Sequence, residues 1–262
     1  MELPSPIPDS PPPKETVRPP TSLAARLLNV FATPGEVFDE VRASRSTVLN
    51  WLVPALISSL VGVLSAIVIF SQPAIVQKLH EAQQQGIEKQ VQAGKLTRQQ
   101  ADQFESTMDK YFGPGTMKVF GSIGAVVSSF IRLFWWALVL WLFGRWFFKA
   151  RFGYLKSVEV AGLSSMIAVL GTIVSLLLIV NLGKLYSSLS LSLAVSDFNP
   201  QNKNHLLLGT VNVFTFWQLG VLSCGLGRLA GAPFTRALVL LVTCWMLLVL
   251  LLVSSNLGSF LL

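Results

Sequence analysis

The chain is poor in the residues on which most enzymes and metal sites depend. Its 262 residues include two cysteines and two histidines, and Asp, Glu, Lys and Arg together make up only 13%. Cys224 and Cys244 both fall within or beside apolar runs, which does not indicate a disulfide framework or a metal site. A soluble domain carries about 25% charged residues. The low charge therefore excludes an ordinary soluble globular protein.

Motifs that carry chemistry are also missing. The sequence contains no Gly-x-Ser-x-Gly, His-Glu-x-x-His or Walker-type loop, and no pair of carboxylates lies within an apolar run. We therefore predict no catalytic residue, no metal site and no cofactor. The first twenty residues lack an apolar core, so no cleavable signal peptide is expected. The net charge is +7, but the basic residues are scattered and form no single basic face, so we expect no nucleic-acid partner.

The chain does have five long apolar runs, at about 48–70, 119–143, 158–182, 206–226 and 237–254. About 20 apolar residues in a helix cross the hydrocarbon core of a bilayer. The sequence therefore predicts an all-α integral membrane protein with five transmembrane helices, in contact with the lipid bilayer. Residues 1–20 are rich in proline, which favours a disordered tail. Residues 21–47 are predicted to form interfacial amphipathic helices, and 48–262 the membrane domain.

Residues 33–43 have the pattern of a capped amphipathic helix. Thr33 is in the N-cap position and Glu36 follows three residues later, the spacing of a capping box, in which both side chains bond free backbone N–H groups. One face of this helix is apolar and consists of Val37, Phe38 and Val41. We expect this face to lie against the headgroups or the bundle. The opposite face is acidic, and is either solvated or docks a basic protein; it consists of Glu36, Asp39 and Glu40.

Residues 71–115 interrupt the apolar pattern and are rich in glutamine. Two helices are predicted here, over about 74–92 and from Thr97 onward, where Thr97 and Gln100 form a second capping box. We expect the two helices to form a hairpin on the far side of the membrane.

The basic residues predict the orientation of the chain. Nine of them fall in the N-terminal region and in the loops that would share its side of the membrane: Arg26, Arg42, Arg45, Arg145, Lys149, Arg151, Lys156, Arg228 and Arg236. The glutamine-rich loop on the other side has nearly balanced charge. By the positive-inside rule, the N-terminus is cytoplasmic.

Two charged residues fall within the predicted spans. Arg132 lies near the middle of the second span, where a charge costs about 2.5–3.5 kcal/mol on insertion scales, so it needs carbonyls, water or an acidic partner. Glu159 is the candidate acid, although its place near the cytoplasmic end of the third span would require a shift of register. The alternative is an arginine that packs or snorkels without a specific role.

Two further patterns occur on the spans. Asn212, Thr215 and Gln218 recur every three residues, which predicts a polar ribbon on the fourth span; such residues bridge helices or bind solute. In the first span Ser58, Gly62 and Ala66 form a stripe of small residues that lets another helix approach closely. That helix belongs either to the same chain or to a second copy, which would make the protein a homo-oligomer.

Three stretches carry a resemblance to a known family. They are Phe31–Phe38 (FATPGEVF), Phe152–Ser157 (FGYLKS) continuing through Ser164 and Ser165, and Asn212–Trp217 (NVFTFW) with Leu222 and Gly225–Gly227. In this order, and with five spans, they resemble the Ypt-interacting-protein (Yip) domain family, and its bacterial members in particular. The resemblance covers about Leu23 to Leu252.

The resemblance implies a five-span protein with a cytoplasmic N-terminus, here in a bacterial cytoplasmic membrane. Eukaryotic members of the family contact prenylated Rab-type GTPases in vesicle traffic. This sequence lacks their Asp-Leu-Tyr-Gly-Pro motif before the first span and inserts the glutamine-rich loop after that span, so GTPase binding is not carried over. We predict a non-catalytic membrane-organising scaffold or partner-binding module, which would bind a membrane or cytoplasmic protein. The alternative is a small transporter or channel subunit that uses Arg132 and the polar ribbon.

Overall fold

The computed structural model describes residues 21–111, 113–196, 198–199 and 202–255, so the proline-rich segment 1–20 lies outside the described residues. The described part is helical, and apart from an isolated bridge between Ser190 and Asn212 it contains no strand. Its elements are α1 (Leu23–Ala32), α2 (Pro34–Ala43), α3 (Leu49–Ile69), α4 (Pro73–Gln92), α5 (Arg98–Tyr111), α6 (Pro114–Trp146), α7 (Tyr154–Leu182), η1 (Leu191–Ala194), α8 (Lys203–Thr210), α9 (Val213–Ala230) and α10 (Phe234–Ser254).

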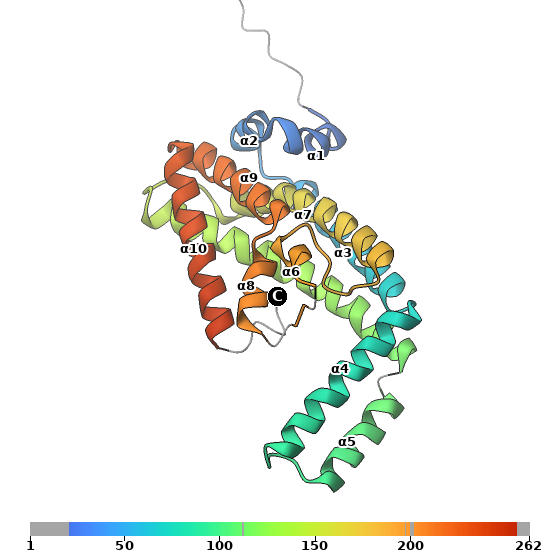
Figure 1. Cartoon of the computed structure of the whole chain (residues 1–262). Helices are drawn as coiled ribbons and strands as arrows, with labels where there is room; N and C mark the ends of the chain where they lie inside the picture. Colours follow the sequence, from blue (N-terminus) through green and yellow to red (C-terminus); the bar gives the residue numbers. More distant parts are fainter. Residues whose placement is uncertain (1–20, 112, 197, 200–201, 256–262) are drawn as a thin grey trace, which may run out of the picture.

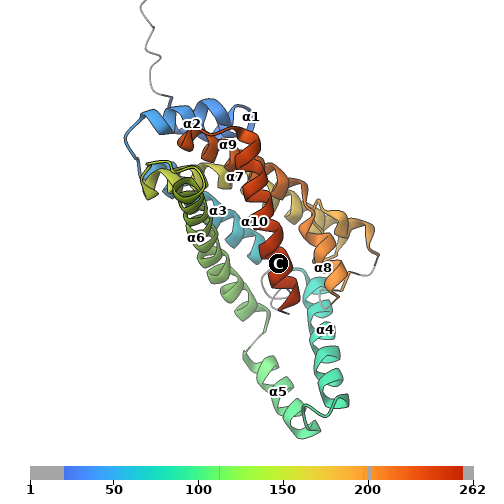
Figure 2. The ribbon, with the colours of Figure 1, turned by 90° about the vertical axis from the view of Figure 1, so that its left-hand side faces the viewer.

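Five of these helices are long and apolar enough to cross a membrane: α3, α6, α7, α9 and α10. The helices α3, α6 and α7 pack on one another, α9 packs on α7, and α10 packs on α9. The short helices α1 and α2 lie across one end of this bundle, and α4 and α5 project from the other (Figures 1 and 2). The fold class predicted from the apolar runs is confirmed.

The fourth span differs from its prediction. A continuous helix was expected over 206–226, but α8 ends at Thr210 and α9 begins at Val213. Two backbone hydrogen bonds to the preceding loop cause the break: Leu191 N–H donates to Val211 O (3.2 Å) and Val213 N–H donates to Leu189 O (3.1 Å). Residues 211–213 are therefore paired as a β-bridge and cannot also continue a helix. The span itself is α9, whose 18 residues measure about 27 Å.

The helices α4 and α5 pack on each other as the expected hairpin. Gly94 has a positive φ of 68° in the connecting turn. The second capping box is present: Gln100 N–H donates to Thr97 Oγ1 (3.2 Å), and Thr97 N–H donates to the Gln100 side chain (2.9 Å). Both side chains thus satisfy backbone donors at the start of α5, as the sequence predicts.

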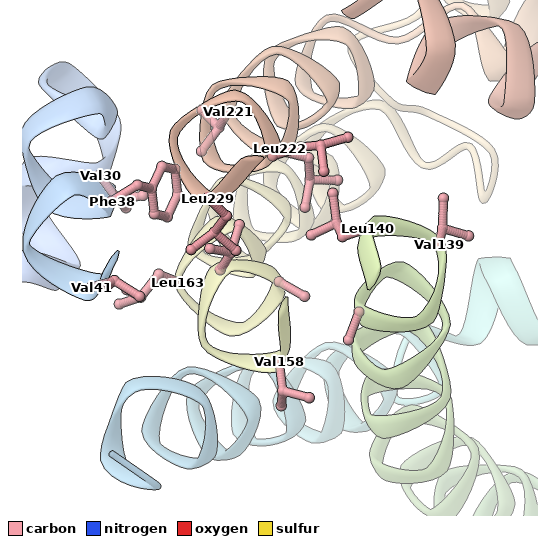
Figure 3. Packing of buried hydrophobic residues seen from close by; sticks show 14 of the residues in the cluster. Val30, Phe38, Val41, Val139, Leu140, Val158, Leu163, Val221, Leu222 and Leu229 are labelled. Carbon is pink, nitrogen blue, oxygen red and sulfur yellow. The ribbon is translucent and has the colours of Figure 1, made fainter. Parts of the chain in front are cut away.

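The bundle depends on close helix contacts inside the chain. A Cβ atom on Gly62 of α3 would lie 2.9 Å from the Cβ of Ala125 on α6, and one on Gly162 of α7 would lie 2.4 Å from the Cα of Trp51 on α3. Gly62, and with it the small-residue stripe of α3, therefore faces α6 of the same chain, as the intramolecular alternative predicted. The apolar core beside these contacts collects side chains from α1, α2, α6, α7 and α9 (Figure 3).

Candidate functional site

The apolar face of α2 is buried in the bundle. Val37, Phe38 and Val41 are 3%, 0% and 0% exposed, and α2 packs mainly on α9. Figure 3 shows Phe38 and Val41 pointing from α2 toward α9 and α7. Gly225 of α9 leaves the space for this, since a Cβ there would lie 2.2 Å from Val160 and 3.3 Å from the Phe38 ring. This face was expected to lie against either the headgroups or the bundle, and in the structure it lies against the bundle.

The capping box predicted at Thr33 does not form. Thr33 ends α1 and begins α2, and its side chain makes no cap hydrogen bond to α2. Its backbone N–H, the donor that Glu36 would have bonded, already donates to Asn29 O (2.7 Å), and its hydroxyl is directed to the same carbonyl at 3.5 Å. Because the Thr33 N–H is already bonded within α1, it is not available to the Glu36 side chain, and the capping box cannot form at the start of α2.

Beneath α1 and α2 lies a buried carboxylate. Glu159, in the first turns of α7, is 1% exposed. One of its oxygens accepts a hydrogen bond from Thr47 N–H (2.6 Å) and from the Asn50 amide (3.0 Å). The Lys156 ammonium lies 3.2 Å from the other oxygen, in an ion pair without hydrogen-bond alignment. Glu159 was proposed as a partner of Arg132, and the structure pairs it with Lys156 instead.

This carboxylate belongs to a chain of polar contacts that reaches α1. The side-chain oxygen Oδ1 of Asn50 accepts a hydrogen bond from Arg26 Nη1 (3.3 Å). Arg26 Nε in turn donates to the Glu40 carboxylate on α2 (3.3 Å). Lys156 Nζ also donates to Val41 O and to Ser44 O, the latter at 2.7 Å. We call the side chains of Arg26, Glu40, Asn50, Lys156 and Glu159 the docking network. It ties α1 and α2 to the first turns of α3 and α7.

The docking network is balanced in charge and mostly buried. Two cations, Arg26 and Lys156, face two carboxylates, and their side chains are only 11% and 15% exposed. Removing one member of such a buried pair leaves an uncompensated charge, at about 3–5 kcal/mol. No pattern in the sequence pointed to Asn50, and Arg26 and Lys156 were noted only among the basic residues that predict the orientation. Helical spacing could have suggested the pair of Lys156 with Glu159, three residues later.

A second ion pair fastens the outer side of α2. Arg228 Nη1 of α9 lies 2.8 Å from Asp39 Oδ2, with both side chains about half exposed. Of the acidic face predicted on α2, Glu40 is thus bound to Arg26 and Asp39 to Arg228, while Glu36 has no ion pair among the described residues. Most of the acidic face is engaged within the chain.

Arg132 lies apart from the docking network. It lines a cavity of about 40 Å³ between α3, α6, α7 and α9, together with Ser58, Ser129, Ser165 and Gln218. Among the described residues Arg132 makes no ion pair or hydrogen bond. A cavity of this volume holds water, which needs about 10–15 Å³, but falls well below the roughly 300 Å³ at which ligand pockets begin. Water molecules and the side-chain oxygens that line the cavity can solvate the positive charge of Arg132.

The polar ribbon predicted on the fourth span is only partly on a helix. Asn212 precedes α9 and caps it, because its side chain accepts from Phe214 N–H (2.8 Å). Thr215 and Gln218 are within α9 and half-buried, and Gln218 reaches the Arg132 cavity. The structure therefore brings Arg132 and Gln218 together and assigns Asn212 to the helix start.

Within the described part of the chain no group of three or more His, Cys, Asp or Glu side chains is placed to hold a metal ion. Comparison with known proteins gives one match: a family model described as the Yip1 domain matches residues 28–255. Searches of curated proteins and of solved structures returned no match. The matched range begins within α1 and ends just after α10, so it includes all five spans, the Arg132 cavity and every member of the docking network except Arg26.

Proposed function

This chain belongs to the Yip1 domain family of multi-pass membrane proteins, and on that premise we propose that it is a non-catalytic scaffold or partner-binding module. It would lie in a bacterial cytoplasmic membrane with its N-terminus in the cytoplasm, as the basic loops indicate. Its partner would be a membrane or cytoplasmic protein that binds the pair of helices α1 and α2.

The docking network is the observation that carries this proposal. A surface that must present the same residues to a partner has to be held rigidly, and five polar side chains, of which Asn50 and Glu159 are fully buried, hold α1 and α2 on the bundle. On this pair of helices the apolar side chain of Leu28 is 70% exposed, and the exposed carboxylate of Glu36 has no ion pair among the described residues. Both groups are therefore available to a partner, and burial of the leucine on binding would be favourable.

Photo-crosslinking in native membranes tests the proposal. A photoreactive residue at Leu28 should capture a defined protein, whereas one at Leu250, a lipid-facing position of α10 that is 55% exposed, should capture none. Phe38→Asp should abolish the capture, because a buried carboxylate would release α2 from α9. The control is Ala43→Asp, which adds the same charge at an exposed position of α2 and should leave the capture intact. Equal capture from both positions would contradict the proposal.

The Arg132 cavity favours a second candidate, a small transporter or channel subunit. An intramembrane charge beside hydroxyl and amide groups is the usual mark of a solute or ion path. In this structure the cavity has room for water only, which is why we place this function second. Solute flux in proteoliposomes that is lost in Arg132→Leu, with helix content retained, would favour it over the scaffold. Arg145→Leu is the control, since Arg145 ends the same helix and stacks on Trp141 outside the cavity.

A further inference from the structure

A pocket of about 800 Å³ lies at the end of the bundle away from α1 and α2, between α4 and the loop 183–199. Its position follows from the chain: Ile75 belongs to the first turn of α4, directly after α3, and Leu182 is the last residue of α7. One end of the pocket thus adjoins the ends of two spans, α3 and α7, which would place that end near the lipid headgroups. Its volume is within the range of about 300–1,000 Å³ that is typical of ligand sites.

Among the residues that the structure describes, the charged side chains that line this pocket are all basic. They are Lys78 and Lys89 from α4 and Lys184 from the loop. Lys78 donates one hydrogen bond to Gly183 O (3.0 Å) and Lys184 one to Ser196 O (3.2 Å). Because an ammonium group has three N–H donors, both retain free donors. Lys89 makes no ion pair in the described part of the chain.

The two carboxylates of α4 that are close in sequence do not neutralise the lysines. Glu81 accepts a hydrogen bond from Gln77 (3.0 Å), and Glu88 lies 3.6 Å from Arg98 of α5. Neither lines the pocket. Within the described part of the chain, the three ammonium groups therefore have no acidic partner in the pocket, and an anion would supply one.

The rest of the lining is mixed: Gln85, Asn199 and three serines are polar, and the larger part is an apolar wall. It includes Leu79, Leu182, Leu185, Leu193 and Phe198, and Tyr186 packs against Phe198 with ring centroids 5.1 Å apart. Burial raises the pKa of the Tyr186 phenol, so at neutral pH its hydroxyl is protonated and can donate. In the same loop Leu189, Leu191 and Leu193 are 39%, 50% and 42% exposed. A loop with this many exposed leucines is suited to rest on acyl chains.

We propose that this pocket binds one anionic phospholipid from the adjacent leaflet. Its phosphate would lie among Lys78, Lys89 and Lys184, and an acyl chain would run along the apolar wall. A polar anion without a chain would match the lysines but leave the leucines and Phe198 uncovered, which is why the amphiphile is the better occupant. The site does not depend on the function proposed for α1 and α2.

Native mass spectrometry of the full chain, released from vesicles of phosphatidylcholine mixed with phosphatidylglycerol, tests this. We expect one retained phosphatidylglycerol per chain, in clear preference to phosphatidylcholine. A lysine near an anionic membrane surface contributes about 1 kcal/mol, a factor of about five in binding. The triple variant K78Q/K89Q/K184Q should therefore retain at least about tenfold less phosphatidylglycerol. The control K95Q/K118Q/K203Q removes three lysines outside the pocket, on the same side of the membrane, and should retain it.

Two further measurements separate a lipid from a small anion. Leu185→Asn should weaken phosphatidylglycerol retention although all three lysines remain. Inorganic phosphate added in excess should not displace the lipid. Displacement by phosphate, an equal loss in the two triple variants, or no preference for phosphatidylglycerol would each overturn the proposal. Circular dichroism of every variant establishes that helix content is unchanged.

Discussion

The side-chain amide of Asn50 on α3 donates a 3.0 Å hydrogen bond to the carboxylate of Glu159 on α7, 109 residues later in the chain. Gly162, one turn beyond Glu159, makes this contact possible, because the absence of a side chain there lets α7 approach the backbone of Trp51. Through Arg26 the same amide is connected to α1. A single residue of the first span thus joins the docked helices to the third span.

The docking network should be far more sensitive to substitution than the exposed ion pair on α2. We expect Lys156→Met to destabilise the protein by about 3–5 kcal/mol, because it leaves the Glu159 carboxylate buried without a cation. The double variant with Glu159→Gln should recover part of this loss. Arg228→Gln, which breaks the exposed pair with Asp39, should cost no more than about 1 kcal/mol. Thermal unfolding in detergent measures all three, and equal losses would contradict the assignment.

The start of α1, and not the start of α2, should depend on a capping side chain. Ser22 Oγ accepts from Ala25 N–H (3.3 Å), whereas Thr33 makes no such bond. We expect Ser22→Ala to cost about 1 kcal/mol and Thr33→Ala to change stability by no more than about 0.5 kcal/mol. Hydrogen exchange of the first-turn amides of each helix reports the difference. Faster exchange of the first-turn amides of α2 in Thr33→Ala would show that the Thr33 side chain does cap α2, and would contradict this prediction.

Two glycines of the spans should respond in opposite ways to alanine. A Cβ on Gly162 would lie 2.4 Å from a backbone atom of α3, while nothing lies within 4 Å of one on Gly220. Gly162→Ala should therefore destabilise the bundle, by about 1–3 kcal/mol for overpacking. Gly220→Ala should be neutral or stabilise α9 by up to about 1 kcal/mol. Unfolding midpoints of the two variants provide the test, and a harmless Gly162→Ala would contradict the close approach of α3 and α7.

Cysteine labelling checks the predicted orientation, in a background without Cys224 and Cys244. Cysteines at Gln84 and Gln103, exposed on α4 and α5, should react with an impermeant reagent from outside intact cells. Arg151 is the position for the opposite side, since it is exposed in the basic loop after α6, whereas the nearby Ser157 is fully buried. A cysteine at Arg151 should react only after the membrane is opened, because basic loops stay cytoplasmic. Labelling of a cysteine at Arg151 in intact cells would contradict the predicted orientation.

The apolar runs alone determined the number and order of the spans. Inside a bilayer every backbone donor and acceptor must be satisfied within the segment, so an apolar run of sufficient length has to become a helix. This holds even where the packing of the helices is unknown. Local motifs also sufficed when their groups had no other partner, as at Thr97 and Gln100, where the capping box forms as predicted.

Tertiary structure decided the outcome wherever a group had more than one partner available. Thr33 has the same motif as Thr97, but its N–H is taken by α1. The run 206–226 carries no charged residue and is mostly apolar, but pairing with residues 189–191 breaks the helix before Val213. Glu159 was matched with Arg132 because both are charged and lie in spans. One actual partner, Lys156, lies three residues earlier on the same helix. The other, Asn50, reaches Glu159 because α3 approaches α7 closely at Gly162, and the spacing of residues along the chain does not reveal that approach.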